Sequence, residues 1–154
     1  MDPADLAIRW NERLSIGIAE IDADHQRFIL LVNDLLWAIS ARLAKPKIEH
    51  RLRLVIRDAK THFTHEELLF AEHGYPDANH HAELHAELMD QLLRVLDDFN
   101  RSEDYYHSIE YGSIIKQLLL DHLLDEDMKY REFLVSRMNR FGAERSGSKI
   151  QRRA

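Results

Sequence analysis

The chain has 154 residues and no cysteine, and its 27 acidic residues against 21 lysines and arginines give a formal net charge of -6. This length fits one domain with a substantial core. The lack of cysteine excludes disulfides, thiolate nucleophiles and cysteine-ligated metal sites. The acidic balance argues against a nucleic-acid partner, because surfaces that bind nucleic acid usually carry basic patches that neutralise phosphates.

The sequence also argues against a membrane or secretory location. No apolar run approaches the ~18 residues that would span a bilayer. The first ten residues contain acidic side chains where a secretory signal would carry basic ones. We therefore expect a cytoplasmic protein with no membrane partner, and the absence of cysteine agrees with a reducing compartment.

The predicted elements are an extended N-terminal arm, residues 1–17, followed by four long helices. After the arm, apolar residues recur at three- and four-residue intervals, which indicates amphipathic helices. Pro46 separates the first helix from the second, Gly74 ends the second, and Gly142 ends the fourth. The predicted helices span about residues 18–42, 48–73, 79–100 and 106–140.

Four such helices joined by short loops favour an all-α fold, an antiparallel up-down-up-down four-helix bundle. Together with the arm, the bundle forms a predicted domain of residues 1–141. The remaining residues, 142–154, carry four basic side chains against one acidic side chain and lack apolar periodicity. We expect this tail to be disordered, and a role in docking a protein partner is left open.

Two pairs of potential metal ligands lie at helical spacing in the second and third helices. His62 and Glu66 are four residues apart, as are His81 and His85, so each pair lies on one helical face, one turn apart. Both pairs fall on the apolar stripe of their helix and therefore point into the core. A carboxylate left alone in an apolar interior costs several kcal/mol. A compensating group is therefore required.

Three further polar residues occupy inward positions: His25 in the first helix, and His122 and Asp127 in the fourth. Asp127 lies five positions after His122, which leaves the two ~140° apart around an α-helix, so Asp127 would have to reach sideways. Seven groups are too many for one ion, whereas two ions that share bridging carboxylates accommodate them. Such nitrogen and oxygen ligands suit iron, zinc, copper or manganese. The predicted ligands are His25, His62, Glu66, His81, His85, His122 and Asp127.

Each of these groups alone is weak evidence, because a histidine pair on a helix is more often a surface pair or a satisfied core pair. Their combination on compatible faces of four helices is what indicates a site. Glu67, next to Glu66, is expected to be exposed, with a bond to a ligating imidazole as the alternative. The histidines expected to be solvated or at the surface are His50, His65, His80 and His107.

The sequence resembles the hemerythrin family from Trp10 to about Tyr130. All seven predicted ligands match the family pattern with the family spacing. One departure is Leu118, four residues before His122, where many relatives carry tryptophan, and it alters the shape of the pocket. The segments that carry the resemblance are W(x3)LSIGI, ID(x2)H ending at His25, HF(x2)EE at 62–67, GYP(x4)H(x3)H at 74–85 and H(x4)D at 122–127.

This resemblance implies a non-haem centre of two iron ions inside the bundle. One iron takes three histidines, His81, His85 and His122. The other takes two histidines, His25 and His62. Two carboxylates and a solvent-derived oxo or hydroxo group bridge the ions, the carboxylates being Glu66 and Asp127. O2 binds reversibly at the iron that has only two histidines.

The implied function is reversible O2 binding, for oxygen storage, delivery or sensing, and no enzymatic activity. The alternative is a di-iron enzyme, such as an oxidase, peroxidase or ferroxidase. Ferritin-like di-iron proteins use Glu-x-x-His pairs in a carboxylate-rich site, and this sequence contains no Glu-x-x-His. The histidine-rich ligand set therefore favours O2 binding.

Overall fold

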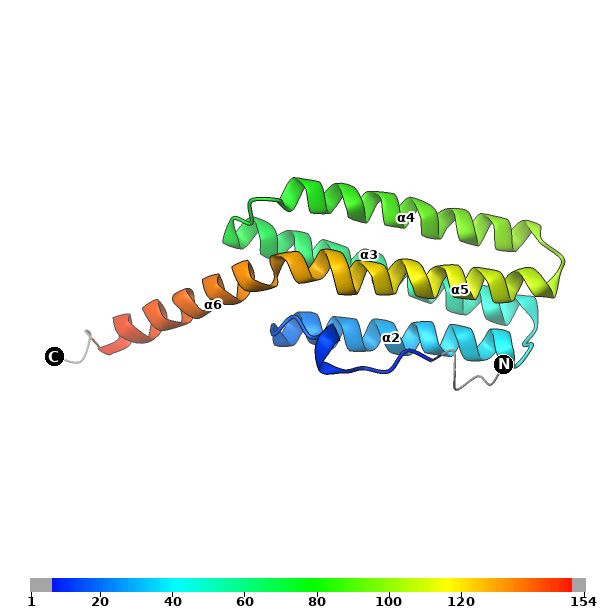
Figure 1. Ribbon diagram of the computed structural model, residues 1–154, viewed down its shortest axis with the longest axis horizontal. Helices are drawn as coiled ribbons and strands as arrows, with labels where there is room; N and C mark the ends of the chain where they lie inside the picture. The colour runs from blue at the N-terminus through cyan, green and yellow to red at the C-terminus, as the bar shows by residue number, and fades with distance from the viewer. Residues whose placement is uncertain (1–6, 151–154) are drawn as a thin grey trace.

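The computed structural model describes the backbone of residues 7–150, and the side chains in this range except those of residues 105, 106 and 144–150. Over this part of the chain the structure contains helices and loops and no strand. The bundle helices are α2 (Ala19–Ser40), α3 (Lys45–His73), α4 (Ala78–Arg101) and α5 (Tyr105–Asp121). They form a closed ring, in which α2 and α4 each contact both α3 and α5. The predicted all-α four-helix bundle is confirmed (Figure 1).

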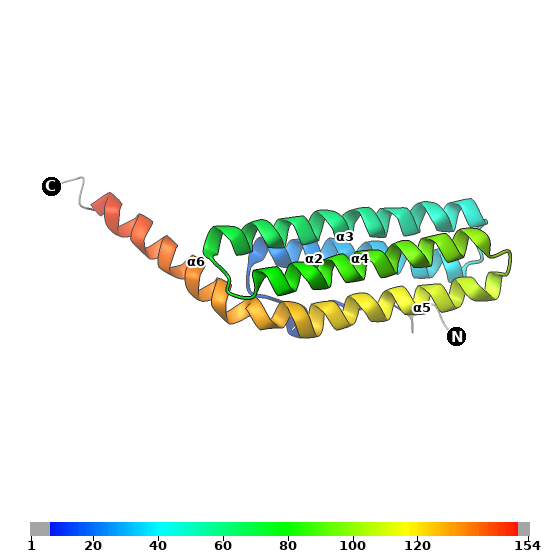
Figure 2. The ribbon, with the colours of Figure 1, turned by 90° about the horizontal axis from the view of Figure 1, so that it is seen from above.

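The fourth helix of the bundle continues beyond the other three. A π-helical segment, η2 (His122–Glu126), joins α5 to α6 (Asp127–Ile150), and α6 projects past the end of the bundle (Figure 2). The predicted helix end near residue 140 is therefore wrong, and residues 142–150 of the predicted disordered tail are helical. Gly142 does not adopt the left-handed conformation that ends helices, and a glycine inside a helix costs only about 1 kcal/mol relative to alanine. Residues 151–154 of the tail lie outside the described residues.

The N-terminal arm is fastened to α2. The backbone N–H of Ile8 donates to Oδ1 of Asn33 at 2.8 Å, and the Ile8 carbonyl accepts from Nδ2 of Asn33 at 2.9 Å. Ile8 and Leu14 are buried in the core, and Leu14 ends a short 3-10 helix, η1 (Glu12–Leu14). The arm therefore covers the bundle along α2, as expected, although its first six residues lie outside the described part.

The ends of α3 follow from local backbone chemistry. Gly74 has a φ of 68° and caps the helix in the left-handed conformation, as predicted. The helix begins at Lys45 rather than near Ile48, because Pro46 lies in the first turn, where a missing N–H breaks no helical hydrogen bond.

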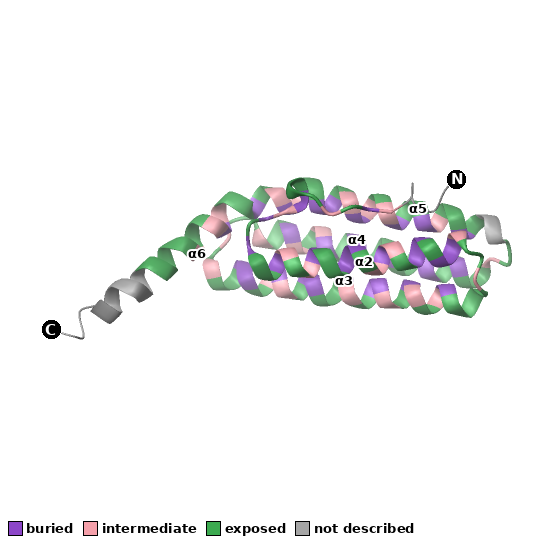
Figure 3. Ribbon diagram, turned by 90° about the horizontal axis from the view of Figure 1, so that it is seen from below, coloured by how far each residue is buried: buried purple, intermediate pink, exposed green. Residues whose placement is uncertain are grey.

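Two apolar clusters fill the interior, with a layer of polar residues between them. Along α3, Ala59 and Phe63 belong to the larger cluster, while Leu69 and Phe70 belong to the smaller one near the start of α6. Buried residues face the inside of the bundle, and the projecting part of α6 is largely exposed (Figure 3). None of the described helices combines the length and the apolar character that a bilayer-spanning helix requires.

Candidate metal centre

The structure brings all seven predicted ligands together in the polar layer. α2 contributes His25, α3 and α4 contribute two residues each, and the junction of η2 and α6 contributes His122 and Asp127. All seven are buried. Three of the histidines predicted to be solvated or at the surface are exposed, as expected, namely His50, His80 and His107.

The seven residues form two groups that share both carboxylates. Within each group the facing nitrogen and oxygen atoms all lie within 4.8 Å of one another. We call the first the three-histidine group, made of His81, His85 and His122 with Glu66 and Asp127. We call the second the two-histidine group, made of His25 and His62 with Glu66 and Asp127.

Glu66 turns one oxygen toward each group. Its Oε2 lies 3.1 Å from Nε2 of His85 and 3.6 Å from Nε2 of His81, in the three-histidine group. Its Oε1 lies 3.5 Å from Nε2 of His62 and 4.0 Å from Nε2 of His25, in the two-histidine group. This is the orientation of a carboxylate that bridges two cations.

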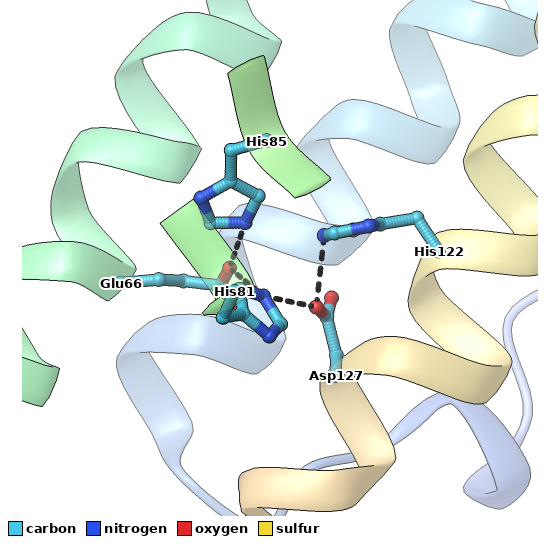
Figure 4. Close-up of side chains that lie close together, drawn as sticks. All are labelled: Glu66, His81, His85, His122 and Asp127. Carbon is cyan, nitrogen blue, oxygen red and sulfur yellow. Dashed lines mark ion pairs between the residues drawn. The ribbon is translucent and has the colours of Figure 1, made fainter. Parts of the chain in front are cut away.

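Asp127 is divided in the same way. Its Oδ1 lies 3.0 Å from Nε2 of His122 and 3.3 Å from Nε2 of His81 (Figure 4). Its Oδ2 faces the other group, 3.3 Å from Nε2 of His25. Glu66 and Asp127 therefore approach the same pair of positions from α3 and from the start of α6.

The π-helical segment η2 explains how Asp127 and His122 meet. In an α-helix these residues would lie ~140° apart, and we expected Asp127 to reach sideways. Instead, the N–H of Asp127 bonds the carbonyl of His122, which is the five-residue hydrogen bond of a π-turn. The wider turn places the two residues one above the other on the inward face. The single α-helix predicted for this stretch is therefore wrong at η2.

Several buried atoms that face the middle of the site make no hydrogen bond with the described residues. Buried polar atoms are normally paired, and leaving them unpaired is costly. Imidazole nitrogens and carboxylate oxygens that converge without hydrogen bonds are the donor set of a metal site, so the residues present fit a pair of cations. The unpaired atoms are Nε2 of His81, His85 and His122, Oε2 of Glu66 and both side-chain oxygens of Asp127.

The charges of the site are strongly coupled. Burial and the neighbouring Asp127 raise the pKa of Glu66, but the surrounding imidazoles, His62 foremost, lower it further, to about 2. Burial also opposes charge on Asp127, and the imidazoles around it, His122 foremost, hold its pKa well below the ordinary value. Burial lowers the pKa of His81, yet Asp127 and Glu66 raise it more strongly, to about 9. The proton that His81 keeps at neutral pH therefore offsets part of the charge of the two carboxylates.

Comparison with known families decides what this site belongs to. The family model described as the hemerythrin HHE cation binding domain matches residues 16–134, and so contains all seven residues. The chain belongs to the hemerythrin family. The buried cluster of this hemerythrin domain is able to hold metal.

Curated relatives of this hemerythrin cover most of its length. A bacteriohemerythrin from Stenotrophomonas maltophilia (strain R551-3) is 28% identical over 135 residues, which is 88% of this chain and 86% of the relative. A bacteriohemerythrin from Pseudomonas aeruginosa (strain LESB58) is 23% identical over 89% of this chain and 88% of the relative. A myohemerythrin from Theromyzon tessulatum is 21% identical over 80% of this chain and 90% of the relative.

Two acidic residues outside the ligand set lie near Nδ1 of ligand histidines in this hemerythrin domain, on the side of the ring away from the centre. Oε1 of Glu67 accepts a hydrogen bond from Nδ1 of His85 at 2.8 Å, although the Glu67 side chain is 42% exposed. Glu67 is therefore partly exposed, as expected, and it also makes the alternative contact, a hydrogen bond to the imidazole of His85. Asp24 lies 3.6 Å from Nδ1 of His62 and 2.6 Å from Nδ1 of His65. His65, which we expected to be solvated, is instead only partly exposed and bound to Asp24.

Sequence reasoning assigned no role to Asp24 or to Tyr130. Asp24 precedes His25 and lies off the apolar stripe, so no spacing signal identifies it. Tyr130 lies on the inward stripe of α6, fully buried, and its hydroxyl donates to Oε1 of Glu66. Its phenolic group in an apolar stripe is the signal that could have identified it, because a buried hydroxyl needs a partner.

A surface depression of about 180 Å³ reaches one residue of the three-histidine group, His122. It is lined in part by Leu118 and His122. His122 is 6% exposed, whereas the other six ligands are 3% exposed or less. Leu118 therefore lies at the least covered side of the site.

Proposed function

We propose that this chain holds two iron ions and binds O2 reversibly, in a role of oxygen storage, delivery or sensing. One observation supports this above the others: two buried carboxylates divide five histidines into a group of three and a group of two. A site for one ion does not need the division. A pair of ions does, because each ion then shares both carboxylates.

The two groups differ in how many protein ligands they offer. The three-histidine group supplies five residues and the two-histidine group supplies four. A cation held by the three-histidine group would therefore have one protein ligand more than a cation held by the two-histidine group, which would be left with a position for an exogenous ligand. A pair of ferrous ions bound there would supply the electrons that reversible O2 binding requires.

The chain keeps water and proton donors away from that position. The two apolar clusters enclose the polar layer along the bundle. Phe63 stacks on His85 with ring centroids 4.1 Å apart and also contacts His62 at 5.9 Å and His122 at 5.4 Å. The hydroxyl of Tyr130 donates to Glu66 and is therefore engaged. Such a dry environment suits a small apolar gas and gives no recognition group for a charged substrate.

The test is an anaerobic titration of the iron-loaded, reduced protein with O2. We expect an absorption band in the visible range that appears with O2 and disappears under vacuum over repeated cycles, with two irons per chain by metal analysis. The variant His62→Gln, which removes a ligand of the two-histidine group, should lose the reversible band. The exposed His50→Gln should retain it. Irreversible oxidation with turnover of an added substrate would instead favour a di-iron oxidase or peroxidase.

A further inference from the structure

Each group of the site contains one histidine that is held between two carboxylates. In the three-histidine group, Nε2 of His85 lies 3.1 Å from Oε2 of Glu66, and its Nδ1 bonds Glu67 at 2.8 Å. In the two-histidine group, Nε2 of His62 lies 3.5 Å from Oε1 of Glu66, and its Nδ1 lies 3.6 Å from Oδ2 of Asp24. A carboxylate therefore faces Nδ1 of one histidine on each side of the centre. Glu67 is hydrogen-bonded to His85, and Asp24 at 3.6 Å is within ion-pair range of His62.

A carboxylate at Nδ1 has two effects on a neutral imidazole. It keeps the single ring proton on Nδ1, so the lone pair of Nε2 is free to bind a cation. It also fixes the plane of the ring and increases the basicity of the ligating nitrogen. We propose that Asp24 and Glu67 are positioning residues, Asp24 for the two-histidine group and Glu67 for the three-histidine group, and that they set the metal affinities of the two groups separately.

The two carboxylates are anchored to different degrees. Asp24 is 13% exposed, and Arg27 donates to its Oδ1 at 3.0 Å while His65 binds its Oδ2 at 2.6 Å. Arg27 is itself tied to Asp58 on α3 at 2.7 Å. Glu67 is 42% exposed. Among the described residues, its side chain has one hydrogen-bond partner, His85. A fixed and less exposed charge acts on its neighbour continuously. On this ground Asp24 has the larger effect, although its 3.6 Å distance to Nδ1 of His62 exceeds the 2.8 Å from Glu67 to Nδ1 of His85.

This asymmetry places the stronger positioning residue beside the group with fewer histidines. The two-histidine group has one imidazole fewer to bind its cation, and the anchored Asp24 strengthens one of the two that remain. The inference rests on the proposed function, because it assumes that each group holds one cation. It adds that the affinity of the two-histidine group for its cation depends on Asp24, a residue that is not itself a ligand.

The test is a titration of the metal-free protein with Co²⁺, followed by calorimetry and visible absorption. Asp24→Asn and Glu67→Gln are matched variants, since each removes one negative charge and retains the side-chain shape. We expect Asp24→Asn to weaken one of the two binding steps by about 10- to 100-fold, and Glu67→Gln to weaken the other step by less. Arg27→Gln, which alters the anchor without touching His62, should change both steps less than Asp24→Asn does.

A second measurement separates positioning from general damage to the fold. In the Zn²⁺-loaded protein, nitrogen-detected magnetic resonance of the histidine rings reports which nitrogen carries the proton. Asp24→Asn should shift the Nδ1 proton signal of His62 and leave that of His85 unchanged, and Glu67→Gln should do the reverse. If Asp24→Asn disturbs folding, the half-exposed Glu67 tests the same claim on the other group.

The outcomes distinguish this inference from the proposed function. A wild-type protein that binds two Co²⁺ ions, with variants that leave both affinities within twofold, overturns the inference and leaves the proposed function intact. Equal weakening of both steps by either variant also overturns it, because the groups would not be tuned separately. A wild-type protein that binds fewer than two ions contradicts the proposed function itself.

Discussion

Tyr130 on α6 donates a hydrogen bond to Oε1 of Glu66 on α3, and both side chains are fully buried. Burial raises the pKa of Tyr130 well above its ordinary value, and the nearby Asp127 and Glu66 raise it further. The hydroxyl therefore keeps its proton and remains a donor. The ring is held by contacts with Phe70 at 4.9 Å and with His81 at 5.5 Å. α6 thus orients the Glu66 carboxylate as well as supplying Asp127.

Replacing Tyr130 by Phe should destabilise the metal-free protein. The change removes a buried hydrogen bond to a charged group, and such bonds contribute about 1.5–3 kcal/mol. Urea unfolding of the metal-free variant measures the loss. Tyr75→Phe is the control, because Tyr75 packs on the same aromatic cluster while partly exposed, and it should change the free energy of unfolding by no more than about 0.5 kcal/mol. Equal free energies of unfolding for the two variants would show that the hydrogen bond from Tyr130 to Glu66 does not stabilise the fold.

Replacing Glu66 by Gln should reduce metal binding in both groups. An amide is neutral and has one oxygen, so it cannot present an anionic oxygen to each of two cations as Glu66 does. We expect the variant to retain one ion or none after loading and desalting, as measured by elemental analysis. Glu72→Gln, an exposed change on the same helix, should retain two. Two tightly held ions in Glu66→Gln would show that the carboxylate does not bridge.

The metal-free protein should lose stability as the pH rises from about 6.5 to about 9. His81 has a pKa of about 9 in the folded chain against about 6.5 unfolded, so its contribution is fully present below pH 6.5 and is lost through pH 9. The expected loss is on the order of 1–3 kcal/mol. Glu66, whose pKa is about 2, loses its contribution at the other extreme, as the pH falls from about 4.5 toward 2.

Urea midpoints at pH 6.5 and pH 9.5 measure this effect. The metal-loaded protein is the control, because cations replace the proton on His81 and should remove the dependence between these two values. Loading at pH 7 should accordingly release protons into a weakly buffered solution. A metal-free protein with equal midpoints at both pH values would show that the His81 proton does not stabilise the fold.

Substitutions at Leu118 should alter how fast metal leaves the site. Leu118 lines the depression over His122, the most accessible of the ligands. Leu118→Ala should widen the opening and accelerate metal transfer to a chelator several-fold, whereas Leu118→Trp should cover His122 and slow the transfer. Leu124→Ala, at an exposed position outside the depression, should not change the rate. Identical rates for all three variants would exclude this side as the exit route.

Much of the candidate site follows from spacing along the chain. His62 with Glu66, and His81 with His85, could be assigned to inward helical faces because four residues in an α-helix return to the same side. The apolar stripes then oriented each helix, and the bundle followed from four stripes joined by short loops. These are local properties, so neighbouring residues carry enough information to predict them.

Other features depend on contacts between distant residues. The π-turn at His122 has no spacing signal, since an α-helical count places Asp127 on the wrong side of the helix. In the structure the wider turn lets both residues be buried at the same centre. Asp24 lies off its helical stripe and acquires a role through His62, a residue of the next helix. The sequence also does not predict the extension of α6 past Gly142, because glycine favours helix ends, whereas the backbone of Gly142 remains helical.

Helical periodicity in the chain was thus sufficient to assign the bundle and six of the seven inward-facing polar residues, because periodicity is a property of consecutive residues. Asp127 is the exception, since the π-turn brings it to the inward face. Periodicity did not supply the division of those residues into a group of three histidines and a group of two. The family resemblance implied it, and in the folded chain a carboxylate oxygen turns toward each group. That division depends on distances across the bundle between side chains on different helices. Such distances are set by how the helices pack, and no spacing along the sequence encodes them.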